Sequence, residues 1–358
     1  MKKYAGLIIQ LIIGGCVGVL AGVMAGKYLP EFETAWPLLI ALVSFVFSFF
    51  IHIILHEGGH LVCGLLSGYK FVSFRVGSLI LVKIDGKYHL KKFNIPGTGG
   101  QCLLDPPDME NGTYPAKLYN LGGGLSNLIF SVIAMLIVVA SGNQYAAVLL
   151  LPFILCGLLL GLTNLIPMKV SGIANDGYNL LSLGKDDVGG LALWQQLRIN
   201  KLQCEGVRLK DMDEDLFALA HSDVEGNPLV DQMKVFWLQR LLDEKRFEEA
   251  EVFARKILRI PNLLALFRFM VQGELLYMEL IGQCRADLVQ QRYTKSLKKF
   301  LKKVKSYPST QRIYYAYAVR LEQNQKKAAK AEKAFQKAIK THPVLGEIEM
   351  EKDLFKEV

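Results

Sequence analysis

Long apolar stretches fill the first half of the chain, whereas apolar and charged positions alternate through the second half. Four stretches approach or exceed the roughly 20 residues that a helix needs to cross the hydrocarbon core of a bilayer. They cover residues 4–24, 36–63, 118–140 and 145–166. The pattern predicts four transmembrane helices. Because further spans follow the first stretch, we expect it to be an uncleaved span and not a signal peptide.

A polar connection between the second and third stretches contains a hairpin signal. The segments FVSFRVGSLILVKID and GKYHLKKFNI meet at Asp85-Gly86. Asp-Gly between two such segments favours a two-residue turn with positive φ at both positions. We therefore expect a β-hairpin next to the membrane, followed by the turn-rich stretch PGTGGQCLLDPP that leads to the third span.

After about residue 190 the chain becomes charged and amphipathic, with a helical period. The segments 245–261 and 330–343 combine small and aromatic positions with a terminal proline, and each resembles the second helix of a tetratricopeptide repeat. We expect an α-helical membrane protein with two domains. Residues 1–190 form a membrane-embedded domain with four transmembrane helices and the hairpin, and residues 191–358 form an all-α helical-repeat domain.

Positive charge predicts the orientation of these spans. Lys2 and Lys3 precede the first span, and the connection 141–144 contains no lysine or arginine. The connection between the second and third spans carries Lys70, Arg75, Lys83, Lys87, Lys91 and Lys92. Because cytoplasmic loops are enriched in these residues, we expect a multi-pass protein of the cell membrane whose N-terminus and C-terminal domain are cytoplasmic. The net charge of +9 fits this bias and an attraction to anionic lipid. No basic motif of a nucleic-acid-binding fold is found, so no nucleic-acid partner is expected.

Ionisable residues interrupt the end of the second apolar stretch, which reads HIILHEGGHLVC from residue 52 to 63. His56 and His60 are four residues apart, so in a helix their imidazoles share one face and can bind one metal ion. Glu57 lies next to the first histidine, and in H-E-x-x-H two histidines bind zinc while the glutamate is the general base. The alternative is a pair of helix histidines satisfied by their neighbours. Ionisable residues inside a membrane are costly and generally functional, which favours the metal.

A catalytic zinc ion needs a third protein ligand. After the fourth span the sequence reads TNLIPMKVSGIANDGYNLLSLG, and it offers Asp176 beside Gly177. We expect Asp176 to be this ligand; the alternative is a turn or N-cap residue, because Asn-Asp-Gly is typical of turns. We expect His52, one turn before His56, to be an ordinary polar neighbour, with a supporting role behind the ligands as the alternative.

Taken together, these motifs resemble the site-2 protease family of intramembrane zinc metalloproteases. The resemblance covers residues 36–185 and rests on HEGGH, on Asn164-x-x-Pro167 followed by Asp176-Gly177, and on LGGGLSNLIF with Asn127. It implies that Zn²⁺ is bound by His56, His60 and Asp176, that Glu57 is the catalytic base, and that Asn127 and Asn164 face the active site and contact substrate. Helix–helix hydrogen bonding is the alternative for both asparagines. In the family the aspartate follows the proline more closely than here, which predicts a longer loop before Asp176.

The expected function is an intramembrane zinc metalloprotease that hydrolyses peptide bonds in or near transmembrane segments. Its substrate would be a membrane-spanning protein or peptide, and a cytoplasmic regulator or substrate would bind the helical domain. The basic stretch 291–308 would contact anionic lipid or an acidic partner, or it is the solvated face of a helix. The alternative functions are a non-catalytic membrane scaffold of the same fold and a metal transporter. The scattered cysteines predict neither a disulfide framework nor a zinc cluster.

Overall fold

The computed structural model describes residues 5–29, 36–95, 98–170, 172–183, 187–224 and 226–358. Residue contacts divide the chain into two units. The first, called the membrane unit below, takes its described residues from 1–71 and 99–190, and the second, the helical unit, takes them from 72–98 and 191–358. Lys2 and Lys3, which contribute to the predicted orientation, lie outside the described residues.

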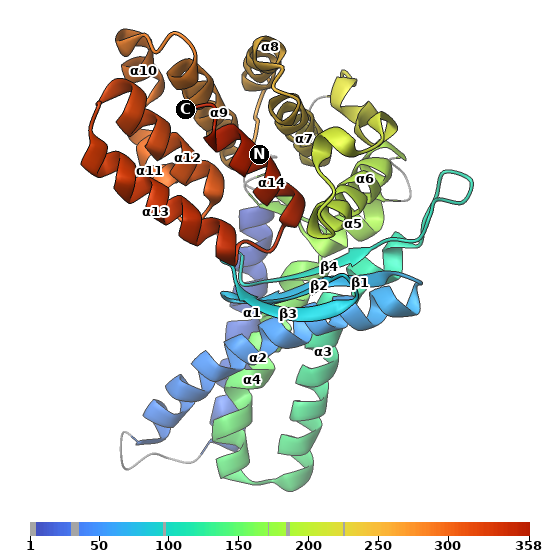
Figure 1. Cartoon of the computed structure of the whole chain (residues 1–358). Coiled ribbons are helices and arrows are strands. Elements are labelled where there is room, and N and C mark those ends of the chain that lie inside the picture. The colour runs from blue at the N-terminus through green and yellow to red at the C-terminus, as the bar shows by residue number, and fades with distance from the viewer. Residues whose placement is uncertain (1–4, 30–35, 96–97, 171, 184–186, 225) are drawn as a thin grey trace. The chain divides into compact units, whose positions relative to one another are not determined.

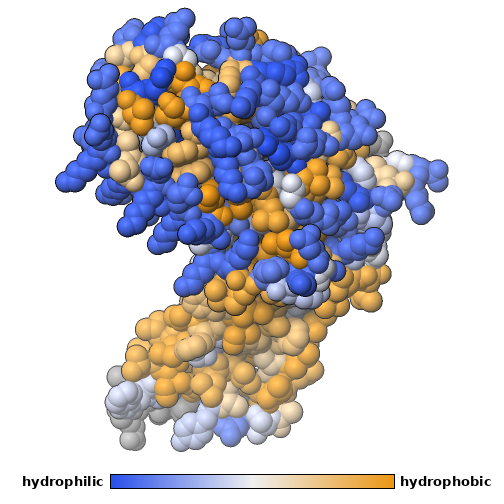
Figure 2. Space-filling view, viewed as in Figure 1, coloured by the Kyte–Doolittle hydropathy of each residue, from blue (hydrophilic) through white to orange (hydrophobic). Residues whose placement is uncertain are grey.

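Four long apolar helices confirm the four predicted spans (Figure 1). They are α1 (Ala5–Tyr28), α2 (Trp36–Leu66), α3 (Ala116–Ser141) and α4 (Gln144–Leu165). Large apolar side chains such as Leu38, Phe47 and Leu136 face outward and are exposed, and the surface of these helices is largely hydrophobic in Figure 2. Such a surface is stable in hydrocarbon and unfavourable in water, so the chain is a multi-pass membrane protein.

Glycines bring the transmembrane helices into close contact. A Cβ atom on Gly59 of α2 would collide with the carbonyl group of Gly122 on α3, and the reverse also holds. Gly124 of α3 and Gly161 of α4 meet in a similar way. Small residues at such crossings let helices pack where no hydrophobic effect drives them together. These crossings hold α3 between α2 and α4.

The connection between α2 and α3 forms an antiparallel sheet whose strands are β1 (Lys70–Val76), β2 (Leu79–Ile84), β3 (Lys87–Lys92) and β4 (Gly100–Asp105), in the order β3-β2-β1-β4. The predicted hairpin at Asp85-Gly86 is confirmed: both residues have positive φ, and Ile84 pairs with Lys87. The segment expected as one strand before this turn is divided in two. Gly77, with φ of 58°, turns the chain so that Val76 pairs with Leu79. Part of the stretch expected to be turn-rich forms β4 instead.

Contacts join the end of β3 to the C-terminal part of the helical unit. The Lys91 ammonium group donates a hydrogen bond to the His342 carbonyl oxygen at 3.2 Å. The Phe93 ring lies edge-on to the His342 ring and also contacts the Tyr307 ring, with centroid distances of 5.1 and 5.4 Å. The strands expected beside the membrane are therefore packed against the C-terminal helices.

The rest of the helical unit is a succession of shorter helices (Figure 1). These are α6 (Asp187–Cys204), α7 (Pro228–Asp243), α8 (Phe247–Leu258), α9 (Ala265–Ile281), α10 (Ala286–Arg292), α11 (Lys295–Lys303), α12 (Pro308–Ala316), α13 (Gln325–Thr341) and α14 (Leu345–Phe355), with short 3₁₀ turns at Leu209–Asp211 and Glu214–His221 and a π turn at Tyr317–Leu321. The predicted helices in 245–261 and 330–343 correspond to α8 and the second half of α13. Helix α8 packs against α7 and α9, α10 packs against α9, and α13 packs against α12, while α14 contacts α7 and α12.

A buried ionic cluster joins three of these helices. The Arg312 guanidinium group has no exposed surface and donates hydrogen bonds to Glu351 on α14, at 2.7 and 3.2 Å, and to Glu274 on α9, at 2.9 and 3.0 Å. It also lies 3.8 Å from the centroid of the Tyr277 ring. The buried positive charge is thus balanced by carboxylates and an aromatic face.

Candidate metal centre

Helix α2 positions the two predicted histidine ligands one turn apart. His56 and His60 project from the same face, and their Nε2 atoms are 3.2 Å apart. The rings are nearly perpendicular, with centroids 4.8 Å apart and an interplanar angle of 84°. His60 is buried and His56 is half-buried. The helical spacing therefore brings the same nitrogen of both rings to one point, as the sequence predicted.

Asn175 places the third predicted ligand. It is the N-cap of α5 (Asp176–Ser182), where its side-chain oxygen accepts hydrogen bonds from the backbone N–H groups of Tyr178 and Met168. Its amide nitrogen donates to the carbonyl oxygens of Thr163 and Ile166 at 2.7 and 2.6 Å. These bonds tie the first turn of α5 to the end of α4. Asp176, the next residue, is thereby held at the start of α5.

The longer loop predicted before Asp176 contains a miniature hairpin. Strands β5 (Lys169–Val170) and β6 (Ile173–Ala174) pair antiparallel between Pro167 and Asn175. The chain then returns to α4 so closely that a Cβ atom on Gly177 would collide with the backbone of Leu165. Glycine at this position permits the contact that brings Asp176 to the histidines.

The three predicted ligand atoms converge. Asp176 Oδ2 lies 3.3 Å from His56 Nε2 and 3.4 Å from His60 Nε2. Zinc bonds to imidazole nitrogen and carboxylate oxygen are about 2.0–2.2 Å long, and a tetrahedral arrangement at such lengths separates ligand atoms by about 3.3–3.5 Å. The three observed separations therefore match one face of a zinc tetrahedron and leave a fourth position for water.

Hydrogen bonding alone does not satisfy this cluster. One proton can join the two imidazole Nε2 atoms, which are 3.2 Å apart. Asp176 Oδ2, however, is buried and has no hydrogen-bond partner among the described residues. Burial acts to raise the pKa of Asp176, but the adjacent imidazoles lower it more, so the group stays a carboxylate. A divalent cation would satisfy all three atoms, and the residues present fit a zinc ion.

Backbone geometry fixes the reactive nitrogen of His60. Its Nδ1–H donates a hydrogen bond to the carbonyl oxygen of Tyr119 at 2.7 Å. Because a carbonyl can only accept, the proton lies on Nδ1 and the lone pair lies on Nε2, toward Asp176. The Tyr119 hydroxyl donates in turn to the carbonyl oxygen of Cys102 on β4 at 2.9 Å. The second ligand is thus oriented by α3, which is itself fixed to β4.

Gly123 makes room for both imidazoles. A Cβ atom there would come within van der Waals overlap of ring atoms of His56 and His60. The three glycines of the predicted Gly-rich stretch therefore have separate roles: Gly122 packs on α2, Gly123 faces the imidazoles and Gly124 packs on α4. At Gly123 the two imidazoles therefore face the backbone of α3, and this position has no side chain that could bind a metal.

Glu57 lies where α2 meets the start of β4. A Cβ atom on Gly100 would overlap the Glu57 carboxylate, so the two residues are in close contact. Burial, with the Glu57 charge as a smaller cause, raises the pKa of the neighbouring Cys102 thiol to about 12. Cys102 is therefore not a thiolate ligand. A carboxylate next to a water-binding metal is the arrangement that a general base requires.

The two predicted substrate-contacting asparagines lie in different surroundings. Asn127 has no exposed surface and lies 3.2 Å from His56 Nδ1 and 3.1 Å from His52 Nδ1. Asn164 is half-buried and donates a hydrogen bond to the Leu160 carbonyl oxygen of its own helix. His52, expected to be an ordinary neighbour, thus contacts Asn127, which contacts the predicted ligand His56.

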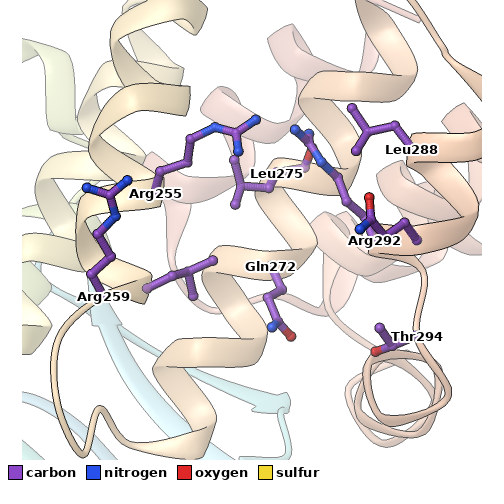
Figure 3. A pocket seen from close by; sticks show the side chains of 9 residues that line it. Arg255, Arg259, Gln272, Leu275, Leu288, Arg292 and Thr294 are labelled. Carbon is purple, nitrogen blue, oxygen red and sulfur yellow. The ribbon is translucent and has the colours of Figure 1, made fainter.

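A second, chemically different pocket lies in the helical unit (Figure 3). It has a volume of about 440 Å³ and is lined by Arg255, Arg259 and Arg292 among polar and apolar side chains of α8, α9 and α10. Glu251 accepts hydrogen bonds from Arg255 and Arg292, each at 2.7 Å. Positive charge therefore exceeds negative charge here. The basic stretch 291–308 continues from it as α11, whose Leu297 and Leu301 are buried and whose lysines are exposed.

Sequence reasoning did not identify Asn175 as the residue that places Asp176. Asn-Asp-Gly before a helix is an N-cap pattern. In the sequence analysis the cap was an alternative role for Asp176 and was not assigned to Asn175. The structure shows that the cap is Asn175 and that the predicted ligand, Asp176, is the next residue. No model of a known protein family matches the chain, and no significant match is found among curated proteins or solved structures.

Proposed function

We propose that this chain is an intramembrane zinc metalloprotease that hydrolyses peptide bonds in or near the transmembrane segments of membrane proteins or peptides. The observation that carries the proposal is the convergence of His56 Nε2, His60 Nε2 and Asp176 Oδ2 at mutual distances of 3.2–3.4 Å beside Glu57. This cluster lies in a bundle of apolar helices. Ionisable groups inside a membrane are energetically costly and generally have a function.

His56, His60 and Asp176 would hold the zinc ion, which supplies a Lewis acid that brings the pKa of its water toward 7. Glu57 would take the proton from that water as the oxygen attacks the peptide carbonyl, and would return it to the leaving amine. Substrate helices must unwind locally, because an intact helix shields its carbonyl groups.

The decisive experiment uses Glu57→Gln, which keeps the size of the side chain and removes the base. Small membrane-derived peptides are compared by mass spectrometry between cells with the wild-type chain and cells with the variant. We expect fragments of transmembrane segments only with the wild type, while both proteins contain one zinc ion per chain. Identical fragments in both would refute the protease. A zinc-dependent accumulation of metal in sealed vesicles would indicate the transporter instead.

We also propose the orientation that the charge distribution predicts, with the helical unit in the cytoplasm. The connection between α2 and α3 carries the lysines, and the turn between α3 and α4 carries none. In intact cells, Asn143→Cys is expected to react with a membrane-impermeant maleimide, and Asp211→Cys only after permeabilisation. The wild-type chain gives the background from its own cysteines. Labelling of Asp211→Cys in intact cells would reverse the topology.

The arginine pocket supports binding of an acidic partner by the helical unit. Its three guanidinium groups exceed the two neighbouring carboxylates of Glu251 and Glu279, and the exposed lysines of α11 extend the positive surface. A regulator or substrate with an acidic cytoplasmic segment, or anionic lipid, fits this charge. Arg259→Glu is expected to weaken binding of a labelled six-residue Glu-Leu repeat peptide, measured by fluorescence anisotropy. Vesicles rich in phosphatidylserine test the lipid.

A further inference from the structure

A line of buried polar groups continues from His56 away from the predicted ligands. His52 and Asn127 have no exposed surface. His56 Nδ1 lies 3.2 Å from Asn127 Nδ2, Asn127 Oδ1 lies 3.1 Å from His52 Nδ1, and His52 Nε2 lies 2.9 Å from the Phe153 carbonyl oxygen. The line crosses from α2 to α3, returns to α2 and ends on α4.

The His52 ring is seated by its surroundings. It packs on the Phe153 ring with centroids 4.2 Å apart. A Cβ atom on Gly157 would overlap both the His52 ring and the Ser131 hydroxyl group. The position of the ring is therefore set by packing, so its hydrogen bonds depend on where its protons lie.

The Phe153 carbonyl oxygen determines the first proton in the line. A carbonyl only accepts, so His52 Nε2 must carry a hydrogen. In a neutral ring Nδ1 then bears a lone pair, and its partner must be the amide NH₂ group of Asn127. That orientation turns the Asn127 oxygen toward His56, whose Nδ1 must donate. The lone pair of His56 is left on Nε2, the atom that faces Asp176 and His60.

The structure places the amide the other way round, with Oδ1 toward His52 and Nδ2 toward His56, and this orientation conflicts with metal binding. With the Asn127 oxygen toward His52, both nitrogens of His52 must donate, so the ring must be an imidazolium ion. No carboxylate is among the hydrogen-bond partners described for His52, and a buried unpaired charge is costly. The amide NH₂ group would also force His56 Nδ1 to accept, which moves the proton to Nε2. A half-turn of the amide removes both problems with little movement of its heavy atoms.

We propose that His52 and Asn127 are positioning residues that hold His56 in the Nδ1–H tautomer and so direct its Nε2 lone pair at the metal. The two histidine ligands are then oriented by different means. His60 donates directly to the Tyr119 carbonyl oxygen, whereas His56 reaches the Phe153 carbonyl oxygen through two side chains. Both ends of the Asn127 amide are used inside the protein, which separates this role from substrate contact. The inference rests on the metal site of the proposed function and is independent of cleavage.

Zinc affinity tests the role of Asn127. For the full chain in detergent, measured by competition with a chelator, Asn127→Leu is expected to bind zinc about 10–100-fold more weakly, the range typical of residues behind metal ligands. Asn127→Asp keeps an acceptor for His56 Nδ1–H and should retain most of the affinity. Asn120→Leu is the matched control: Asn120 is buried on the same helix, donates to the Ala116 carbonyl oxygen and should not matter for zinc. Equal affinity of Asn127→Leu and the control would overturn the proposal.

Nitrogen-15 NMR of histidine-labelled, zinc-loaded protein tests the proton positions, which a merely structural role would not fix. His56 is expected to carry its proton on Nδ1, and His52 to carry one proton, on Nε2. A proton on His52 Nδ1 would overturn the inference and leave the protease proposal intact. If these results hold while Glu57→Gln produces the same fragments as the wild type, the protease proposal fails alone. If the wild-type chain binds no zinc, both the protease proposal and the positioning role of His52 and Asn127 are refuted.

Discussion

Two buried polar clusters, one in each unit of the chain, are built on opposite principles. In the helical unit, Arg312 donates to the carboxylates of Glu274 and Glu351, so a positive group is paired with negative groups within the protein. In the membrane unit, two imidazole nitrogens and the Asp176 carboxylate oxygen face each other at 3.2–3.4 Å. All three atoms are electron-pair donors, and the described residues of this cluster include no arginine or lysine.

The comparison shows which kind of cluster is complete by itself. A buried charge is tolerated when it is paired and hydrogen-bonded. Arg312 pairs with two carboxylates through Nε and Nη2, although its Nη1 has no hydrogen-bond partner among the described residues. The buried Asp176 Oδ2, by contrast, has no hydrogen-bond partner among the described residues. The first cluster therefore holds helices together through its ion pairs, whereas the second gathers three atoms that could bind a cation. A divalent cation is the partner that its ligand types and spacing fit.

The largest expected effect is the loss of bound zinc when both histidines of the candidate metal centre are removed. A four-ligand zinc site contributes about 10–16 kcal/mol in small zinc domains, or roughly 2.5–4 kcal/mol per ligand. The double variant His56→Ala/His60→Ala is therefore expected to lose stoichiometric zinc, measured by elemental analysis of the purified chain. His89→Ala, which removes an exposed histidine of β3, is the control and should keep the metal. Zinc retained by the double variant would place the metal elsewhere.

Breaking the paired cluster should affect stability and leave zinc in place. Arg312→Met leaves the buried Glu351 and the half-buried Glu274 carboxylates without their cation and should lower the free energy of unfolding by about 3–5 kcal/mol. The measurement is denaturant unfolding of the full chain in detergent, followed by the fluorescence of Trp194 and Trp237. Arg246→Met removes ion pairs that are largely exposed, so its effect should be below about 1 kcal/mol. Equal effects of the two variants would contradict a structural role for the buried pair.

Two glycines near the metal centre form a matched pair. A Cβ atom at Gly123 would overlap both imidazoles, whereas one at Gly58 meets nothing within 4 Å. Gly123→Ala is therefore expected to weaken zinc binding by about 10–100-fold, comparable to other changes beside metal ligands. Gly58→Ala should bind zinc like the wild type. The prediction fails if chelator competition gives the same affinity for both variants.

The ionic cluster around Arg312 should also make the free energy of unfolding depend modestly on pH. Burial raises the pKa of Glu351 to about 7, although Arg312 acts to lower it. Between the ordinary pKa and this value, the folded chain holds a proton that the unfolded chain releases, so the free energy of unfolding falls as pH rises from about 5 to 7. The slope from one proton is at most about 1.4 kcal/mol per pH unit. Glu351→Gln should lose this component when the two unfolding curves are compared across that range.

Much of the fold could be predicted because its signals are local. Span length depends on bilayer thickness, and apolar runs of sufficient length became α1 to α4. The Asp85-Gly86 turn followed from the φ preferences of two residues. The division of the preceding strand at Gly77 was missed, because a single glycine in an apolar run is as compatible with a continuous strand as with a turn. The packing of Phe93 on His342 was also not predicted, since residues so far apart in sequence share no local pattern.

The sequence by itself determined that His56 and His60 share one helix face, because helical geometry fixes the separation of residues four apart. It also identified Asp176 as a candidate ligand. Only the tertiary structure decided that Asp176 meets the histidines, since that contact depends on the Asn175 cap and on Gly177 packing against Leu165. It alone revealed the line through Asn127 to His52, because hydrogen bonds between helices depend on how the helices pack and leave no periodic trace along the chain.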